Sequence, residues 1–401
     1  MLMSVSNAPT GAAAQALPPG TTILQVLPAL GHGGVERGTL EVAGAIAEAG
    51  GRALVASEPG PNVERLTRLG GEHIAMSLAS KNPLTIRANA AKLAELIERE
   101  NVSLVHARSR APAWAAHMAA ERTKTPFVTT FHAAYSESGP LKKRYNSVMA
   151  SGDRVIAISH FIARLIRQRY DTPPGRLRVI HRGVDLNAFD PAAIGAGRLT
   201  AVRKQWGVGA NARIVLMPAR LTRLKGHGVL ISAIANLLRA RHLPDLVCVL
   251  VGADAGRDAY REELQKHVRT VGLDPQRIVF APHCEDIAAA MYLADVVVSA
   301  STEPEGFGRT LAEAAAMGKP VIATAHGPAG EIVVDGETGW LVPPGKAGPM
   351  AEALATVFGL SPRQRQALAF KAMHRARRMF SKQVMCERTL EVYRELLSKT
   401  P

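Results

Sequence analysis

Short apolar runs alternate with longer amphipathic stretches along most of the chain. In the first half, the apolar runs lie at residues 23–28, 52–57, 103–107, 126–131 and 153–159, and the amphipathic stretches between them lie at residues 35–49, 83–100 and 111–122. Strands that alternate with helices form right-handed βαβ units, which assemble into a parallel sheet. The pattern therefore predicts an α/β domain in the first half of the chain.

The same alternation restarts after a stretch rich in Pro, Gly and Ala at residues 189–197. Apolar runs follow at residues 213–218, 246–252, 277–282, 294–299 and 320–324, with predicted helices at residues 227–241 and 257–271. The loop motifs of the two halves differ, so the halves are not sequence repeats. We therefore predict two parallel-sheet α/β domains in tandem, with ligands bound beyond the carboxyl ends of their strands.

The two ends of the chain differ from this pattern. Residues 1–20 are small and polar, without the basic start or the long apolar middle of a secretory signal, and we interpret them as a disordered leader. In residues 382–399 one stripe at helical spacing contains Cys386, Leu390, Tyr393 and Leu397. The tail is therefore predicted to be an amphipathic helix that packs against another part of the protein.

The composition is that of an ordinary soluble protein. The 401 residues are 47% hydrophobic and 21% charged, which suggests two or three domains. The longest apolar runs have the length of a strand, far short of the roughly 20 residues that span a bilayer. The three cysteines, Cys248, Cys284 and Cys386, form no CxxC pair. They indicate neither a disulfide framework nor a zinc site, and they favour a reducing cytoplasm.

The net charge of +15 raises three kinds of partner: nucleic acid, an anionic membrane surface and a phosphorylated substrate. Residues 142–178 hold nine Lys or Arg residues against two Asp residues. No interleaved aromatic residues, RNP-like string, helix-turn-helix pattern or zinc spacing accompanies them, so sequence-specific nucleic-acid binding has little support. This segment, with Lys142, Lys143, Arg144 and Arg164, is either a solvated basic face or a surface for an anionic membrane or acceptor.

Two loops have features of phosphate-binding sites. GHGGVERG at residues 31–38 follows the first strand, where backbone amides and a helix dipole can hold a phosphate. Glu36 stands where a dinucleotide fingerprint needs its third glycine, and a purely structural tight turn is an equal alternative. Arg220 and Lys225 lie between a strand and a helix, an arrangement that suits a diphosphate unless the loop charges are incidental.

A third segment, EPEGFGRTLAE, combines two carboxylates with a glycine-rich turn. Glu305 lies in the loop, and Glu313 lies about one turn into the following helix. Gly306 and Gly308 free the backbone amides of residues 307–310. A carboxylate can accept hydrogen bonds from two vicinal hydroxyls, which sugars present. Taken without this context, Glu313 could be a helix charge near a positive N-terminus.

Together these motifs resemble the retaining family 4 glycosyltransferases with a GT-B fold, of the bacterial cell-envelope and lipopolysaccharide type. The resemblance rests on Arg220-x4-Lys225, on Glu305-x7-Glu313, on the double glycine Gly33-Gly34 and on VIHRGVD at residues 179–185. It covers about residues 21–400. In VIHRGVD, His181 and Arg182 replace the Pro and Asn that are more usual in the family.

The resemblance implies two Rossmann-like, doubly wound domains that face each other across a cleft. The N-terminal, acceptor-binding domain would comprise residues 21–195, and the C-terminal, nucleotide-sugar-binding domain would comprise residues 196–380. A last helix at residues 381–401 would return to the first domain.

The resemblance also implies roles for individual residues. Arg220 and Lys225 would neutralise the diphosphate. Glu305 would hold hydroxyls of the donor sugar, and His132 would face the reacting sugar. The donor-binding residues would further include Gly33, Gly34, Cys284, Ile287, Phe307, Gly308, Arg309, Thr310 and Glu313, with Glu313 at the ribose and Cys284 and Ile287 near the base.

The implied activity is transfer of an α-linked sugar from a nucleotide-diphosphate donor to a cell-envelope glycan or lipid-linked acceptor. No metal or other cofactor is expected, because Arg and Lys replace the Asp-x-Asp motif and metal of other glycosyltransferases. The expected partners are a nucleotide sugar, the acceptor and an anionic membrane, without nucleic acid, and the expected location is the cytoplasm, including the inner face of its membrane. The alternatives are a GT-B epimerase, a soluble-acceptor glycoside synthase, and a non-catalytic basic protein that binds nucleic acid or the envelope surface.

Overall fold

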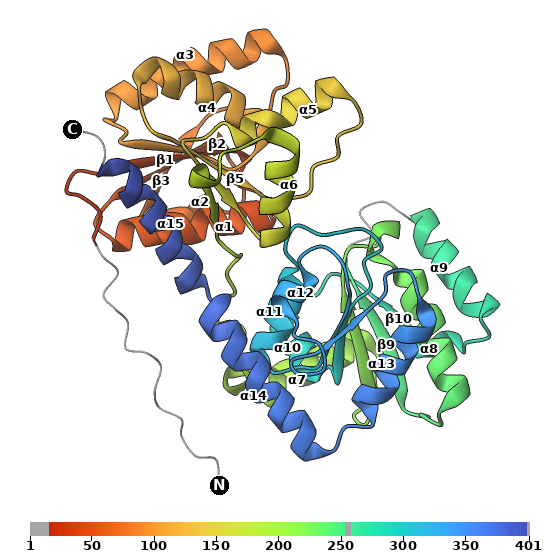
Figure 1. The fold of residues 1–401 in the computed structure, drawn as a ribbon. Coiled ribbons are helices and arrows are strands. Elements are labelled where there is room, and N and C mark those ends of the chain that lie inside the picture. The colour runs from red at the N-terminus through yellow and green to blue at the C-terminus, as the bar shows by residue number, and fades with distance from the viewer. Residues whose placement is uncertain (1–15, 253–257, 399–401) are drawn as a thin grey trace. The chain divides into compact units, whose positions relative to one another are not determined.

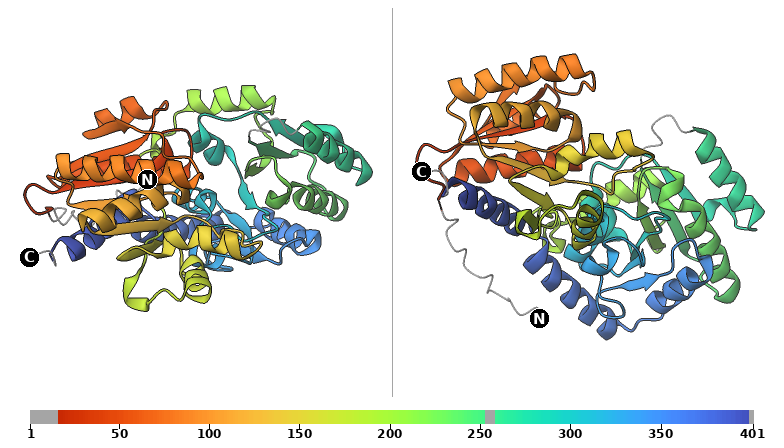
Figure 2. Two further views of the ribbon diagram at one scale, coloured as in Figure 1. Left: turned by 90° about the horizontal axis from the view of Figure 1, so that it is seen from above. Right: turned by 45° about the horizontal axis from the view of Figure 1, so that its top comes forward.

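The chain forms two compact α/β units in a computed structural model that describes residues 16–252 and 258–398 (Figure 1). Unit 1 contains the residues up to His181 and those from Gln383 onward, and unit 2 contains Arg182–Lys382. Each unit has one sheet in which all strands are parallel, with helices on both sides (Figures 1 and 2). The predicted fold class is confirmed.

Unit 1 has a seven-stranded sheet in the order β3-β2-β1-β4-β5-β6-β7. Its strands are β1 (Thr22–Ala29), β2 (Arg52–Glu58), β3 (Gly71–Ala75), β4 (Leu104–Ala107), β5 (Phe127–Phe131), β6 (Arg154–Ala157) and β7 (Leu177–Val179). Its helices are α1 (Gly34–Glu48), α2 (Val63–Arg68), α3 (Pro83–Arg99), α4 (Arg110–Thr123), α5 (Pro140–Ser147), α6 (His160–Tyr170) and α15 (Lys382–Leu397). The central strands β1, β4 and β5 are buried along nearly their whole length because helices cover both of their faces, and they also contain buried polar residues such as Gln25, His106 and Thr129.

Unit 2 has a six-stranded sheet in the order β10-β9-β8-β11-β12-β13. Its strands are β8 (Arg213–Pro218), β9 (Leu246–Val251), β10 (Ile278–Ala281), β11 (Val296–Ser299), β12 (Val321–Thr324) and β13 (Trp340–Val342). Its helices are α7 (Ala196–Trp206), α8 (His227–Ala240), α9 (Asp258–Thr270), α10 (Ile287–Leu293), α11 (Arg309–Ala316), α12 (Ala329–Ile332), α13 (Ala347–Phe358) and α14 (Pro362–Met379).

The C-terminal helix α15 completes the core of unit 1, where it lies along α1 (Figure 1). Its Tyr393 is fully buried, and the Tyr393 hydroxyl hydrogen-bonds Nδ1 of His106 on β4 at 2.6 Å. The other ring nitrogen of His106 bonds the hydroxyl of Thr130 at 2.7 Å. Burial lowers the pKa of His106 well below its usual value, so the neutral ring fills this apolar interior.

Two arginines anchor the end of α15 to the sheet. Glu395 accepts hydrogen bonds from Nε of Arg154 on β6 at 2.8 Å and from Nη2 of Arg178 on β7 at 2.7 Å. Burial raises the pKa of Glu395, but the hydrogen bonds and charges of Arg178 and Arg154 lower it further, so the net shift is downward. The ionised carboxylate therefore holds three segments together.

We expect Glu395→Gln to destabilise unit 1 by about 1 kcal/mol at neutral pH, because both arginines lose a partly exposed ionic partner. The folded-state pKa of Glu395 is depressed, so its contribution is present above the unfolded pKa of about 4.3 and disappears as the pH falls through the folded value. Urea unfolding at neutral pH and below pH 4 measures this. A difference between wild type and variant that does not shrink in acid would contradict it.

The unit boundary differs from the predicted one at residues 195 and 196. Val184 forms an isolated bridge with Ser381, and its amide donates to the carbonyl oxygen of Phe380 at 2.7 Å. Nζ of Lys382 lies 3.1 Å from Oδ2 of Asp185. These bonds fasten the segment after His181 to the end of α14, which places the segment in unit 2.

The disordered leader predicted at residues 1–20 includes residues that pack in unit 1. Leu17 is buried, and its amide donates to the carbonyl oxygen of Ala49 at 2.9 Å. The first 15 residues of the predicted leader lie outside the described residues.

Neither a membrane-spanning helix nor a disulfide occurs among residues 16–252 and 258–398. Among the described residues, no helix has both the length and the apolar character needed to cross a membrane. All three cysteines are buried free thiols.

Candidate active site

The loops that follow the strands of unit 2 gather the predicted donor-binding side chains at one edge of the sheet. One loop follows β8 and contains Arg220 and Lys225, and another follows β11 and contains Glu305. β8 and β11 are neighbours in the sheet, and parallel strands all end at the same edge. This edge is where ligands bind in doubly wound folds.

A glycine locks these two loops together. Gly226 has φ +74°, and a Cβ atom added to it would lie 1.9 Å from the carbonyl oxygen of Ala300. The amide of Thr302 donates to the carbonyl oxygen of Leu224 at 2.8 Å. Because only glycine permits both this conformation and this approach, the sequence KGHG brings the first loop against the second.

The two loops meet in an ion pair. Nζ of Lys225 lies 2.8 Å from Oε2 of Glu305, and the hydroxyl of Ser301 donates to the same carboxylate. Burial raises the pKa of Glu305, but the charge and hydrogen bond of Lys225 and the bond from Ser301 lower it more, so the net shift is downward. Glu305 is therefore ionised at neutral pH, ready to accept hydrogen bonds from hydroxyls. Arg220, on the same loop as Lys225, is exposed.

Helix α11 supplies the second predicted carboxylate. The helix begins after Gly308, which has φ +96°, and Glu313 lies in its second turn with 8% exposure. Nη2 of Arg309 is 3.4 Å from Oε1 of Glu313, one helical turn away. Phe307 is buried, so any contact that it makes with a ligand comes from its backbone.

His326 joins this cluster, and the sequence reasoning missed it. Its Nε2 atom hydrogen-bonds the carbonyl oxygen of Ser301 at 2.8 Å. A small cavity of about 20 Å³ is lined by His326, Glu305 and Phe307 among others. The signal for His326 was its place two residues after the apolar run PVIAT, at the same sheet edge as the other loops.

The loop after β10, predicted to line the base, is held by a second ion pair. Asp286 accepts from the Ala289 amide at 3.0 Å and so caps α10. The same carboxylate accepts two hydrogen bonds from Arg198 on α7, each of 2.7 Å. Cys284 is buried, and with Arg198 and Asp286 it lines an open cavity of about 550 Å³. Ile287 is the first residue of α10. The sequence reasoning did not single out Arg198.

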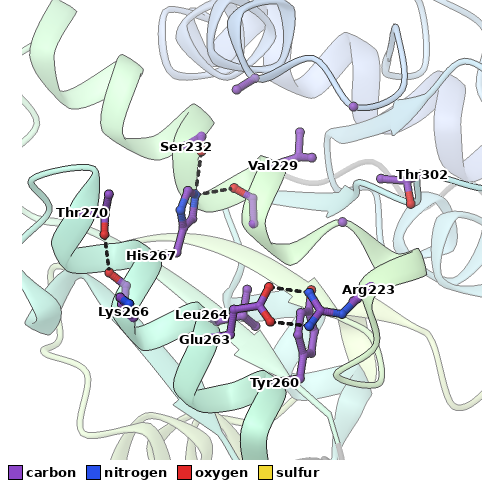
Figure 3. Close-up of a pocket in the computed structure, with 14 residues that line it drawn as sticks. Arg223, Val229, Ser232, Tyr260, Glu263, Leu264, Lys266, His267, Thr270 and Thr302 are labelled. Atoms are coloured by element: carbon purple, nitrogen blue, oxygen red, sulfur yellow. Dashed lines mark hydrogen bonds and ion pairs between the residues drawn. The ribbon is translucent and has the colours of Figure 1, made fainter.

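A different cavity, of about 570 Å³, lies between α8 and α9 (Figure 3). Its lining contains neither Lys225 nor Glu305. On its wall, Glu263 of α9 pairs with Arg223, whose guanidinium lies 5.2 Å from the ring centroid of Tyr260. Arg223 is two residues before Lys225, so its ion pair with Glu263 connects α9 to the loop that contains Arg220 and Lys225.

The remaining predicted site residues lie in unit 1. Gly33 caps α1, and a Cβ atom added to it would lie 2.3 Å from Oε2 of Glu36, so the Glu36 carboxylate folds over the turn. His132 directly follows β5. Its Nε2 atom is buried. Gly34 begins α1.

The basic segment of unit 1 divides into two surfaces. Helix α5 exposes Lys142, Lys143 and Arg144, together with Leu141, whose exposure is 84%. On α6, Arg164 is exposed, but the apolar residues Ile162, Leu165 and Ile166 are buried in the core. Leu141 of α5 is therefore an exposed apolar side chain, whereas these residues of α6 belong to the core.

Two family models match the chain. The model of Glycosyltransferase Family 4 matches residues 32–188, and the model of Glycosyl transferases group 1 matches residues 200–373. A solved structure of a glycosyltransferase from Rickettsia africae ESF-5 is 37% identical, with a TM-score of 0.87, and the match covers 95% of this chain and 100% of that one. The chain belongs to the family 4 glycosyltransferases.

Further relatives of this glycosyltransferase have more specific names. A D-inositol 3-phosphate glycosyltransferase of Nocardioides sp. (strain ATCC BAA-499 / JS614) is 33% identical over 258 residues, which are 62% of this chain and 54% of that protein. The chain thus spans little more than half the length, between 54% and 58%, of three of the curated relatives that it matches. A structure of Anabaena Alr3699/HepE in complex with UDP and glucose is 25% identical, with a TM-score of 0.80, and the match covers 94% of this chain and 100% of that one. These matches confirm the GT-B fold of the glycosyltransferase.

Proposed function

We propose that this glycosyltransferase transfers a sugar from a nucleotide-diphosphate donor, with retention of the α configuration, to a phosphorylated or lipid-linked glycan acceptor. The observation that carries the proposal is the contact between Lys225 and Glu305. In a nucleotide sugar, the diphosphate is attached directly to the anomeric carbon. A cation that binds the phosphate and a carboxylate that binds ring hydroxyls must therefore lie within a few ångströms of each other, as these two side chains do.

The cationic loop would drive departure of the nucleoside diphosphate. Lys225 supplies a compact charge and Arg220 a planar pair of donors, so together they would neutralise the phosphate charge that develops as the glycosidic bond breaks. The amides at the start of α11, from Phe307 to Thr310, would add hydrogen bonds to the same group. In this proposal, side chains replace a metal ion.

The other predicted donor contacts complete this model. Glu313 would accept hydrogen bonds from ribose hydroxyls, and the loop with Cys284 and Ile287 would lie along the base. Gly33 and Gly34 would contribute backbone amides, and His132 would face the reacting sugar.

Retention of configuration requires either a nucleophilic carboxylate or attack from the face that the leaving group vacates. Glu305 is engaged by Lys225 and Ser301, which suits a sugar-binding role better than a nucleophilic one. We therefore favour front-face displacement, in which the leaving phosphate accepts the proton of the acceptor hydroxyl.

Two observations guide the proposal for the acceptor and the location. Relatives named D-inositol 3-phosphate glycosyltransferases favour a soluble phosphorylated acceptor. The exposed Leu141 with Lys142, Lys143 and Arg144 supports peripheral attachment to the cytoplasmic face of an anionic membrane, where each cation contributes on the order of 1 kcal/mol. A cell-envelope glycan acceptor fits this second arrangement.

A panel of UDP, GDP and ADP sugars, with excess chelator present throughout, tests the proposed function. We expect one donor to be turned over without added metal. Glu305→Gln should lose most turnover while the nucleoside diphosphate still binds, because the sugar loses its carboxylate. Glu313→Gln should mainly weaken nucleotide binding. Equal loss of nucleoside diphosphate affinity in both variants, or inhibition by chelator that magnesium reverses, would contradict these roles.

A further inference from the structure

One arginine of unit 1 is held rigidly and yet has no acidic partner among the residues that the structure describes. Arg110 is the first residue of α4, directly after the loop that follows β4. Its guanidinium lies 4.2 Å from the ring centroid of Tyr135 and 5.9 Å from that of Tyr145. Its Nη1 atom donates to Oδ1 of Asn146 at 2.8 Å, and Asn146 is itself fully buried. These contacts fix both the plane and the direction of the guanidinium.

The other nitrogens of the Arg110 guanidinium are available to bind a ligand. Within residues 16–252 and 258–398, no carboxylate pairs with Arg110, and its nitrogens make no further hydrogen bond. The unbonded nitrogens are not among the buried unsatisfied atoms, so solvent reaches them. Many other arginines of the chain are paired, among them Arg52, Arg154, Arg178, Arg198, Arg213 and Arg223.

A second cation, Lys142, is held at the loop that Arg110 contacts. Asn146 also donates to the carbonyl oxygen of Ser136 at 3.1 Å, and Nζ of Lys142 lies 3.3 Å from the hydroxyl of the same serine. Lys142 is thus fastened to the loop that Arg110 braces. The carboxylate of Glu137 in this loop is already occupied by Arg169 and by the hydroxyl of Tyr170.

This cluster lies beside the histidine that is expected to face the reacting sugar. β4 and β5 are adjacent parallel strands, so Arg110 after β4 and His132 after β5 lie at the same edge of the sheet. The Tyr135 side chain links them. Burial raises the pKa of Tyr135, while the charge of Arg110 and a hydrogen bond with the His132 backbone lower it by less.

We propose that Arg110, together with Lys142 held at the same loop, binds a phosphate group of the acceptor. The planar fork of an arginine matches two oxygens of a phosphate, and a lysine adds a movable point charge. Stacking on Tyr135 fixes the guanidinium before the ligand arrives, which reduces the entropy that binding must overcome. The inference rests on the proposed function, because it takes this edge of unit 1 as the acceptor site. The phosphate can belong to a soluble sugar phosphate or to a lipid headgroup.

The test begins with calorimetric titration of inorganic phosphate into the full chain. We expect Arg110→Gln to weaken binding at this site about tenfold, in line with the loss of a charge-assisted hydrogen-bond pair. Arg110→Lys should restore part of the affinity. Arg122→Gln, on the exposed end of the same helix, should bind phosphate like the wild type and so controls for the loss of one positive charge. Arg220→Gln identifies phosphate bound at the donor loop, because that variant should keep the Arg110 site.

Vesicles of phosphatidylcholine with and without phosphatidic acid distinguish the two sources. If the phosphate belongs to a lipid headgroup, Arg110→Gln should bind the acidic vesicles more weakly than Arg122→Gln does. A soluble sugar phosphate predicts equal vesicle binding by the two variants while their phosphate affinities differ. If Arg110→Gln and Arg110→Lys match the wild type in both experiments, the proposal is wrong.

Donor turnover in the same variants separates this inference from the proposed function. Hydrolysis of the nucleotide sugar without acceptor should be unchanged in Arg110→Gln, because the proposed function assigns no donor contact to Arg110. If the wild type turns over no nucleotide sugar, the proposed function fails, and the phosphate titration still decides whether Arg110 binds an anion.

Discussion

Lys225→Ala should lower the turnover number by about 10²- to 10³-fold, which corresponds to roughly 3 to 4 kcal/mol by analogy with the loss of one donor to a developing oxyanion. The reason is that Lys225 is the compact charge fixed at the junction of the two donor loops, 2.8 Å from the carboxylate of Glu305. Initial rates at saturating donor, with chelator present, measure the effect. Arg220→Ala should act in the same direction, because it removes the second cation of the loop.

The control for Lys225→Ala is Lys204→Ala. Lys204 is an exposed lysine of α7 in the same unit, so its loss changes the net charge equally. We expect Lys204→Ala to keep normal turnover. Near-normal turnover in both Lys225→Ala and Arg220→Ala would remove the donor-site assignment, whatever the control does.

Lys225→Ala has a second expected consequence. Without its cation, Glu305 keeps its burial but loses the largest influence that lowers its pKa. The pKa of Glu305 should therefore rise, and the residual activity of the variant should fall at a higher pH on the acid side than that of the wild type. A pH profile from about pH 4 to 8 shows this as a displaced acid limb.

The sequence predicted the repetitive part of the fold well, because its strands are long enough to give a clear apolar run. The run at residues 213–218 is β8, and the helix predicted at residues 111–122 is α4 with one more residue at each end. Several of the elements that were missed are short or polar, whereas α13, which was also missed, is an apolar helix of 12 residues. β13 has three residues, and α14 is strongly polar, with Leu368, Ala372 and Ala376 as its only buried residues.

The candidate site could be predicted where a sequence motif contains its residues, but not where it depends on contacts between distant residues. The resemblance selected Lys225 and Glu305, but their contact depends on Gly226 fitting against Ala300, which no local pattern reveals. His326 and Arg198 act through a backbone carbonyl and through Asp286, respectively. The place of His326 after an apolar run indicates the sheet edge, but a single sequence does not reveal which atom a lone histidine or one of many arginines will contact.

The segment around residue 182 shows the same limitation at the level of domains. The Pro-, Gly- and Ala-rich stretch at residues 189–197 predicted a boundary at residues 195 and 196, because such stretches usually link domains. The structure places the division earlier, because Val184 and Asp185 bond to the residues that follow α14. Hydrogen bonds to a segment almost two hundred residues away outweighed the local composition.

Gly226→Ala should strongly destabilise unit 2. The new Cβ atom would lie 1.9 Å from the carbonyl oxygen of Ala300, and φ of +74° is unfavourable for any residue with a Cβ atom. The left-handed conformation costs roughly 1 to 2 kcal/mol, and relief of the clash by backbone movement adds roughly 1 to 3 kcal/mol. We expect a total loss of about 2 to 5 kcal/mol in the free energy of unfolding, together with loss of turnover.

Gly207→Ala separates the cost of the left-handed conformation from the cost of the clash with Ala300. Gly207 ends α7 with φ of +65°, and a Cβ atom added to it has no neighbour within 4 Å. It should therefore show the conformational cost of roughly 1 to 2 kcal/mol alone and keep normal turnover. Urea unfolding of both variants gives the difference, which measures how firmly the loop of Lys225 is pressed against the loop of Glu305. Equal destabilisation by the two substitutions would mean that the contact with Ala300 yields easily and does not set the distance between Lys225 and Glu305.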